Sequence, residues 1–234
     1  MSAIEILWTL QGVDREIDQA IARGTRARAA IGQVTPELTR ARESHATRST
    51  ALVDAERAQR GLEWEVADRT ARIRTLDERL YSGTIRNPKE LTGMQTEIDH
   101  LRQSLTDIEE KTLIAIDAAE AARQAANASA ASLQRETSAW EEDQAAQRRT
   151  LDEARRFVAS ERARREAITA QIPPPLLARY ADLRKQKQGI GIVAVDRGTC
   201  TGCRTSLPTA TTQAARTGNI VTCSSCGRIV YGGR

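Results

Sequence analysis

The four cysteines of this chain lie close together near its end, and their spacing is that of a metal site. Cys200 and Cys203 form one Cys-x-x-Cys pair, and Cys223 and Cys226 form a second pair. Nineteen residues separate the two pairs. Two such pairs at this separation are typical of sites that bind zinc through four thiolates. The sequence therefore predicts one structural zinc ion, Zn²⁺, held by all four cysteines in a small zinc ribbon.

Four thiolates fill every position of a tetrahedral zinc ion, so we expect a structural and not a catalytic metal. Two alternatives remain open. Two disulfides would need an oxidising compartment, whereas a redox-sensitive zinc switch would release the ion when its thiols oxidise. The N-terminus lacks a secretory signal, and no stretch approaches the roughly 20 apolar residues of a membrane span. We therefore expect a cytoplasmic protein with no membrane partner.

Short strands must carry the cysteine pairs. Runs at 192–195, 220–222 and 228–231 lie beside the cysteines and predict three such strands. Three consecutive prolines at 173–175 end the preceding element, and helical spacing follows over residues 176–185. The C-terminal part, residues 173–234, is thus predicted as a short helix and a small β zinc ribbon.

The first 172 residues are predicted to form two long helices. Aromatic residues make up only 3% of the chain and charged residues 28%, which leaves too few large rings for a wide core. Apolar residues recur at alternating steps of three and four, as in a coiled-coil seam. The expected fold class is mainly α, with a long antiparallel coiled-coil hairpin over residues 1–172.

The predicted turn of this hairpin lies near residues 81–90. Gly83 suits the left-handed residue after a helix, and Asn87 and Pro88 suit the N-cap and the first residue of the next helix. The two arms have similar lengths, which favours pairing within one chain, although the sequence leaves the oligomeric state open.

The turn also predicts which residues face each other. Facing residue numbers should sum to about 172, which places Trp140 opposite Gly32. Gly32 and Pro36 predict a break in the first arm at residues 32–36, because glycine weakens a helix and proline clashes with the preceding turn.

Two surfaces are candidates for binding a partner. The C-terminal part carries nine basic residues against two acidic ones, and such a surface attracts phosphates or an acidic protein. Its candidate contacts are Arg179, Arg184, Lys185, Lys187, Arg204 and Arg228. The second surface is the hairpin tip, since exposed loops on rigid scaffolds often bind partners. Its candidate contacts are Tyr81, Arg86 and Lys89, for which closing the hairpin is the alternative role.

Three segments together resemble a bacterial C4-type zinc-ribbon family with a long N-terminal coiled-coil hairpin, formerly a domain of unknown function. They are LYSGTIRNPKELTGMQTEIDHL at 80–101, IPPPLLARYADLRKQKQGIGIVAV at 172–195, and the two cysteine pairs with the ending CGRIVY. The resemblance implies that the four cysteines bind the metal. It also implies a link to nucleic acid, because members are described as nucleic-acid-binding proteins and some relatives are linked to an alternative sigma factor and to flagellin messenger RNA.

These observations leave two main hypotheses. The first is an interaction scaffold or adaptor that acts on protein partners linked to transcription or RNA through its hairpin tip and ribbon. The alternative is a regulator that binds RNA or DNA directly through the basic tail. We expect no enzyme, because the sequence lacks a glycine-rich phosphate loop, a nucleophile with a base and a clustered carboxylate pair.

Overall fold

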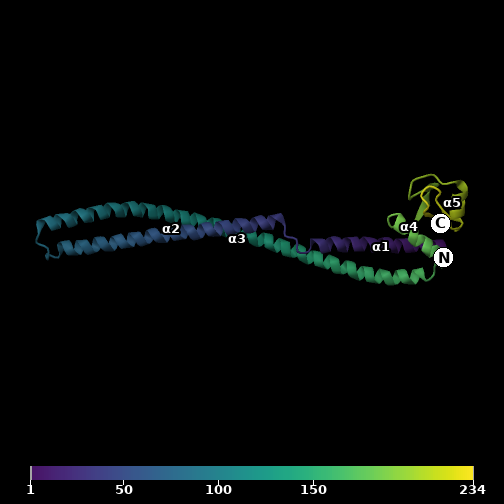
Figure 1. Cartoon of the computed structure of the whole chain (residues 1–234), viewed down its shortest axis with the longest axis horizontal. Helices are drawn as coiled ribbons and strands as arrows, with labels where there is room; N and C mark the ends of the chain where they lie inside the picture. The colour runs from purple at the N-terminus through teal and green to yellow at the C-terminus, as the bar shows by residue number, and fades with distance from the viewer. Residues whose placement is uncertain (1, 234) are drawn as a thin grey trace. The chain divides into compact units, whose positions relative to one another are not determined.

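The computed structural model describes residues 2–233, most of which are helical (Figure 1). The elements are α1 (Ala3–Ala30), α2 (Pro36–Tyr81), α3 (Pro88–Thr169), α4 (Pro174–Gln186), β1 (Ile192–Asp196), β2 (Thr199–Cys200), α5 (Thr209–Arg216), β3 (Val221–Thr222) and β4 (Ile229–Tyr231). This order confirms the predicted helical hairpin followed by a short helix and a small β ribbon. None of the helices in the described part of the chain is long and apolar enough to cross a membrane.

The chain divides into two compact units that differ from the predicted division at residue 172. The hairpin unit is Val34–Glu142, and the ribbon unit combines the segment up to Gln33 with the segment from Asp143 onward. The difference arises because α1 and the last part of α3 pack with α4 and the strands. These helical segments therefore belong to the same unit as the cysteines.

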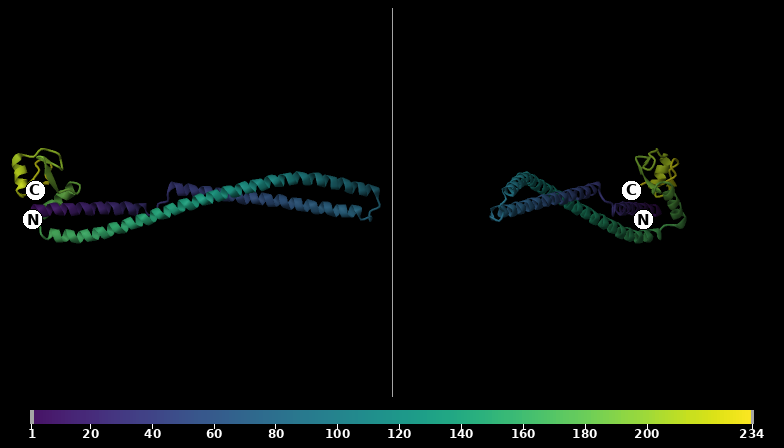
Figure 2. Two further views of the ribbon diagram at one scale, coloured as in Figure 1. Left: turned by 180° about the vertical axis from the view of Figure 1, so that it is seen from behind. Right: turned by 60° about the vertical axis from the view of Figure 1, so that its left-hand side comes forward.

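In the hairpin unit, α2 and the first part of α3 run antiparallel, side by side in both views of Figure 2. Ile73 of α2 and Ile98 of α3 are buried at the predicted seam. Across the two helices, His45 Nδ1 lies 3.3 Å from Ser129 Oγ. These contacts confirm that the two arms pair within one chain.

The turn between α2 and α3 occupies residues 82–87, within the predicted span. Gly83 has a φ of 71°, the left-handed conformation expected after a helix. The Asn87 side-chain oxygen accepts a hydrogen bond from the Lys89 amide at 3.0 Å, directly before the first helical residue, Pro88. Both the stop of one helix and the start of the next are therefore where the sequence placed them.

The first arm is interrupted after α1, also as predicted. Gly32 takes a φ of 85°, and the Thr35 hydroxyl caps α2 by accepting a hydrogen bond from the Leu38 amide at 3.2 Å. Pro36 is the first residue of α2, a position where its missing amide hydrogen costs nothing. The interruption thus follows from ordinary helix-capping chemistry.

The predicted register is close to the observed one between α2 and α3, where His45 lies opposite Ser129, but it is wrong by about one helical turn at the break and beyond it. Gly32 faces Gln144, whose side-chain oxygen accepts the Gly32 amide hydrogen at 2.7 Å, and not Trp140. Closer to the N-terminus, a Cβ added to Gly24 would lie 3.3 Å from the Ala154 Cβ, an offset of six residues from the expected pairing. The offset grows because non-helical residues advance up to about 3.3 Å each and helical residues about 1.5 Å. The non-helical residues of the break therefore lie alongside more residues of α3 than the same number of helical residues would.

The ribbon unit contains two apolar clusters. One joins α1, α3, α4 and two strands, and its buried residues are Ile4, Leu7, Leu10, Ile172, Leu176, Tyr180, Ile192 and Ile229. Beside it, the rings of Trp8 and Tyr231 stack with centroids 5.1 Å apart. The other cluster lies around the cysteines, and its buried residues are Val193, Cys200, Leu207, Ala215, Cys223 and Val230. The same sheet therefore contacts the long helices and encloses the cysteines.

The sheet has the strand order β2-β1-β4-β3. Strand β1 pairs in parallel with β4, with Ile192 opposite Ile229, and the two outer pairs are antiparallel. Three strands were predicted to within one residue at each end. Strand β2 and helix α5 were not predicted, because β2 has two residues and α5 is rich in threonine, a weak helix former.

A buried carboxylate joins α1 to the rest of the ribbon unit. Asp14 is 1% exposed and accepts hydrogen bonds at 2.7 Å from both the Tyr180 hydroxyl and Arg165 Nε. Arg184 lies 3.2 Å from the same carboxylate and 2.6 Å from Asp18. A buried charge is tolerated only when it is paired and hydrogen-bonded. Asp14 therefore requires α3 and α4 to lie where they do.

We predict that Tyr180→Phe destabilises the packing of α4 by about 1–3 kcal/mol, because Asp14 stays buried with one donor fewer. Amide hydrogen exchange in α4, followed by mass spectrometry, measures the effect. Tyr231→Phe is the matched control, since the Tyr231 hydroxyl makes no hydrogen bond among the described residues. Equal protection in the two variants would contradict the prediction.

The same bond has a defined pH dependence. Burial and the hydrogen bond to Asp14 raise the pKa of Tyr180. Because the folded-state pKa is the higher one, the stabilisation is complete below the ordinary tyrosine pKa of about 10 and declines above it. The difference between Tyr180→Phe and the unmodified protein should therefore be constant from neutral pH to about 9.

Candidate metal centre

The two cysteine pairs form two turns of the same construction. In the first turn, the Arg204 amide donates to the Cys200 carbonyl at 2.7 Å, and in the second the Gly227 amide donates to the Cys223 carbonyl at 2.9 Å. Both closing residues are left-handed, with φ of 60° at Arg204 and 74° at Gly227. Each turn directs its two sulfurs to the same side.

The four sulfur atoms of the cysteines lie close together around one point. All four Sγ atoms lie within 4.8 Å of one another, with Cys200 and Cys226 at 3.9 Å and Cys203 and Cys223 at 3.6 Å. A tetrahedral ion with bonds of about 2.3 Å to sulfur requires sulfurs about 3.8 Å apart. The distances therefore fit a zinc ion between the two turns. All four cysteines are free thiols, which does not support the alternative of two disulfides.

The parallel pairing of β1 with β4 brings the two turns together. Cys200 follows β1 through a short antiparallel partner, β2, and the second turn connects β3 to β4. The backbone of Gly202 hydrogen-bonds to the Cys200 sulfur, and Gly202 also packs closely against its neighbours. A Cβ on Gly202 would lie 2.8 Å from Val193 Cγ1 and 3.1 Å from Arg228 Cδ, closer than side chains normally approach.

The surroundings shift the pKa values of two of the thiols in opposite directions. Burial raises the pKa of the Cys200 thiol to about 12, whereas hydrogen bonds from the side chain and backbone of Thr205 lower the pKa of Cys203 to about 6. Zinc binds thiolates, so its binding must displace the proton of the Cys200 thiol. Zinc affinity should therefore decrease as the pH falls.

The structure separates the predicted basic contacts into two groups. Arg184 pairs with Asp14 and Asp18, and Arg228 donates to the backbone carbonyls of Ile190 at 3.0 Å and Lys187 at 3.2 Å, so both stabilise the fold. The remaining four reach the surface, with Lys187 half-buried: Arg179, Lys185, Lys187 and Arg204. The basic surface available to a partner is therefore smaller than the sequence suggested.

The predicted tip contacts are all at the surface. Tyr81, the last residue of α2, is 80% exposed, and Arg86 and Lys89 are exposed on the following turn and at the start of α3. Such exposure is unusual for a tyrosine ring, which normally buries its apolar body. The turn therefore presents one aromatic and two basic side chains to the solvent.

Sequence reasoning missed one residue that positions the ribbon. The Gln11 side chain, 3% exposed, donates to the Gly189 carbonyl at 2.9 Å and accepts the Gly191 amide hydrogen at 2.8 Å. It thereby holds the backbone directly before β1. Its signal was a polar residue four positions after Leu7 and three before Asp14, on the buried face of α1.

Known proteins share both parts of this architecture. Residues 10–188 match the CT398-like coiled coil hairpin domain, and residues 199–230 match the C4-type zinc ribbon domain. The solved structure of CT398 from Chlamydia trachomatis has a TM-score of 0.63 at 15% identity, covering 98% of this chain and 97% of that one. A structure from Mycobacterium smegmatis has the same TM-score at 22% identity, covering 98% and 99%. No functionally curated protein matches the chain. The small β domain is thus a C4-type zinc ribbon whose four cysteines hold one structural zinc.

We predict that Cys223→Ser abolishes stoichiometric zinc and unfolds the ribbon while most helical circular dichroism persists, because the metal supplies the folding free energy of so small a domain. Elemental analysis and hydrogen exchange over β1–β4 measure the two effects. Ser224→Ala, an exposed change within the same turn, is the control. A zinc-free protein whose ribbon stays protected from exchange would contradict the prediction.

Proposed function

Since the chain belongs to the family of the CT398-like coiled coil hairpin domain, we propose that it is a non-enzymatic scaffold that binds protein partners through its hairpin tip and its zinc ribbon. The observation that carries this proposal is the tip itself. A hairpin needs only a short capped turn to reverse direction, yet this one exposes the ring of Tyr81 at the end of α2. An exposed tyrosine flanked by two cations suits an acidic, partly apolar protein surface.

The zinc ribbon supports a binding role and not a catalytic one. Its metal is enclosed by four thiolates, which leaves no coordination position for a substrate. The ribbon is also packed against α1 through the stacked Trp8 and Tyr231 rings. We infer that the ribbon is a second contact surface. The family resemblance makes transcription-associated or RNA-associated proteins the first partners to test.

The alternative is direct binding of nucleic acid by the basic tail. Arg179, Lys185, Lys187 and Arg204 are the accessible cations that favour it. Two of the six predicted contacts, Arg184 and Arg228, already bind within the protein, which weakens this alternative. Tyr231 stacks on Trp8, so its ring is less available to a base. The protein-scaffold function therefore has the stronger support.

We predict that the triple variant Tyr81→Ala, Arg86→Glu and Lys89→Glu loses protein partners and keeps its helicity, because all three side chains are exposed. Affinity capture from the native cytoplasm, with nuclease added, measures partner loss. The matched control changes one exposed aromatic and two exposed arginines on the arm of the hairpin: Trp64→Ala, Arg48→Glu and Arg57→Glu.

A second variant separates the two functions. Changing Arg179, Lys185 and Lys187 to glutamine should leave protein capture intact and should reduce the salt dependence of any nucleic-acid binding by about one unit of slope per lost phosphate contact. Arg184 is left unchanged because its loss would remove a cation that pairs with both Asp14 and Asp18. If the tip variant keeps every partner while this variant loses RNA or DNA, direct nucleic-acid binding replaces the scaffold function.

A further inference from the structure

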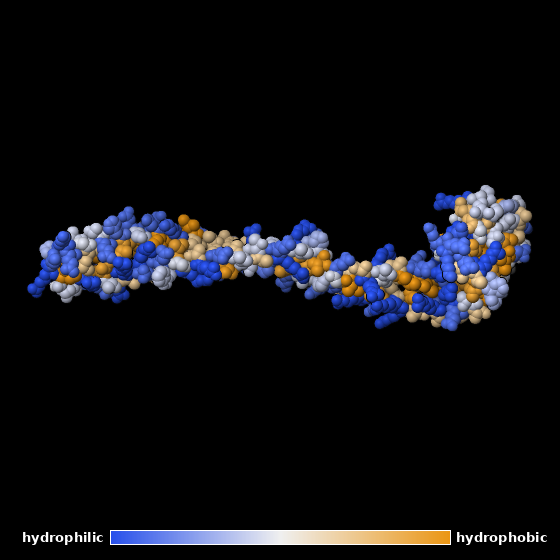
Figure 3. Space-filling model, viewed as in Figure 1, coloured by the Kyte–Doolittle hydropathy of each residue, from blue (hydrophilic) through white to orange (hydrophobic). Residues whose placement is uncertain are grey.

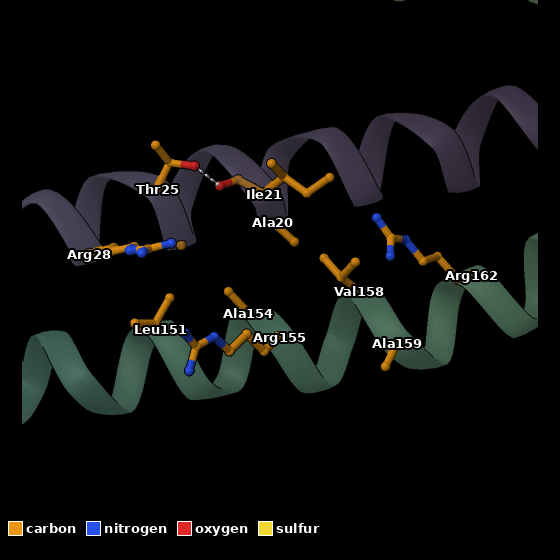
Figure 4. A pocket seen from close by; sticks show the side chains of 11 residues that line it. Ala20, Ile21, Thr25, Arg28, Leu151, Ala154, Arg155, Val158, Ala159 and Arg162 are labelled. Carbon is orange, nitrogen blue, oxygen red and sulfur yellow. Dashed lines mark hydrogen bonds between the residues drawn. The ribbon is translucent and has the colours of Figure 1, made fainter.

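A groove lies between α1 and the last part of α3, within the ribbon unit (Figure 4). Its volume is about 320 Å³, and it is separate from both the zinc ribbon and the hairpin tip. The side chains of Ala20, Leu151, Ala154 and Val158 point into the space between the two helices. The groove is therefore a third surface that the proposed function does not use.

The floor of the groove is apolar and shallow because its residues are small. Gly24 and Ala154 approach so closely that a Cβ on Gly24 would lie 3.3 Å from the Ala154 Cβ. Ile21 borders this floor and is 44% exposed, although it lies beside buried Ala20. On the face shown in Figure 3, hydrophobic side chains reach the surface where α1 and α3 run together. The apolar area open to a ligand thus comes from exposed Ile21 and from the partly exposed Leu151 and Val158 beside the buried floor.

Three arginines surround this apolar floor. Arg28 and Arg162 stand toward opposite ends of the groove, and Arg155 lies along the α3 side (Figure 4). Arg28 and Arg162 form no ion pair with any residue between 2 and 233. Arg155 contacts Asp152 at 3.4 Å, a pair in which both side chains are more than half exposed. The groove therefore has an apolar centre and a positive border.

We propose that this groove binds an acidic amphipathic helix of a partner protein. Arg155 and Arg162 are seven residues apart on α3, about 10 Å along the helix axis, so the cations border about two turns of a bound helix. Apolar side chains at every third or fourth position would cover Ile21, Leu151 and Val158. Carboxylates beside that stripe would pair with the arginines.

The chemistry of the floor distinguishes this partner from nucleic acid. Phosphates need the arginines but gain nothing from Ile21 or Val158, and no aromatic ring lines the groove for a base to stack on. The side chain of Thr25 donates to the Ile21 carbonyl at 2.9 Å, so its hydrogen is not offered to a ligand. The combination of aliphatic floor and cationic border fits an acidic helix.

The test uses the full-length, zinc-loaded protein and a fluorescein-labelled peptide of about four helical turns, with leucine at every third or fourth position and glutamate between. Fluorescence anisotropy should show saturable binding that weakens with added salt. The variant Arg28→Glu, Arg155→Glu and Arg162→Glu should raise the dissociation constant at least about tenfold by reversing three contacts. Ile21→Ala should weaken binding through lost apolar contact.

Two controls make the result specific. Arg148→Glu, Arg149→Glu and Arg156→Glu reverse three exposed arginines of α3 outside the groove and should leave binding unchanged. A peptide with lysine in place of glutamate should fail to bind the unmodified protein and should bind the groove variant with reversed charges. Circular dichroism confirms that each variant is folded.

Several outcomes would overturn the proposal. They are no binding of the acidic peptide, equal loss in the two arginine variants, or unchanged binding in Ile21→Ala together with binding of a single-stranded oligonucleotide. Sedimentation that shows a dimer lost only in the groove variant would instead make a second copy of the chain the occupant. The hairpin tip is unchanged in all these variants, so this test and the partner-capture test fail independently.

Discussion

The buried carboxylate of Asp14 constrains the whole ribbon unit. A charge that is 1% exposed must keep its partners, and these come from Tyr180 and Arg184 of α4 and Arg165 of α3. The three elements can therefore meet in only one arrangement without leaving a charge buried and unpaired. Gln11, one turn earlier on α1, extends this constraint to the backbone before β1. A polar face of one helix thus determines where the ribbon begins.

Zinc and the long helices organise the ribbon from opposite sides. The metal ties together two turns that belong to different parts of the sheet. The parallel pair β1 and β4 connects the metal to the helices, because Ile192 and Ile229 pack into the cluster that includes Leu7 and Leu10. A change at the zinc site would therefore alter the packing around α1 through the sheet.

The sequence was informative where the chemistry is local. Cysteine spacing predicted the metal ligands, and Gly83 with Asn87 and Pro88 predicted the turn, because each depends on neighbours within a few residues. Contacts between distant segments could not be derived in the same way. The partners of Asp14 depend on how α1 docks, and the register depends on how far the non-helical residues near Gly32 extend. The sequence gives the number of residues in each arm. Which residues of two helices face each other depends on the distance that those residues cover along the helix axis.

The contact between Asp14 and Tyr180 joins residues 166 positions apart, and this separation has a consequence for the order of folding. During synthesis α1 is made long before α4, the helix that completes its packing. Until then the apolar face around Leu7 and Leu10 lacks its native cover, as the residues of that cluster outside α1 begin at Ile168. An apolar surface exposed for that long favours aggregation or chaperone binding. The helices of the nascent hairpin unit can pair with each other earlier. The ribbon unit is therefore the part that folds slowly and is most open to aggregation during synthesis.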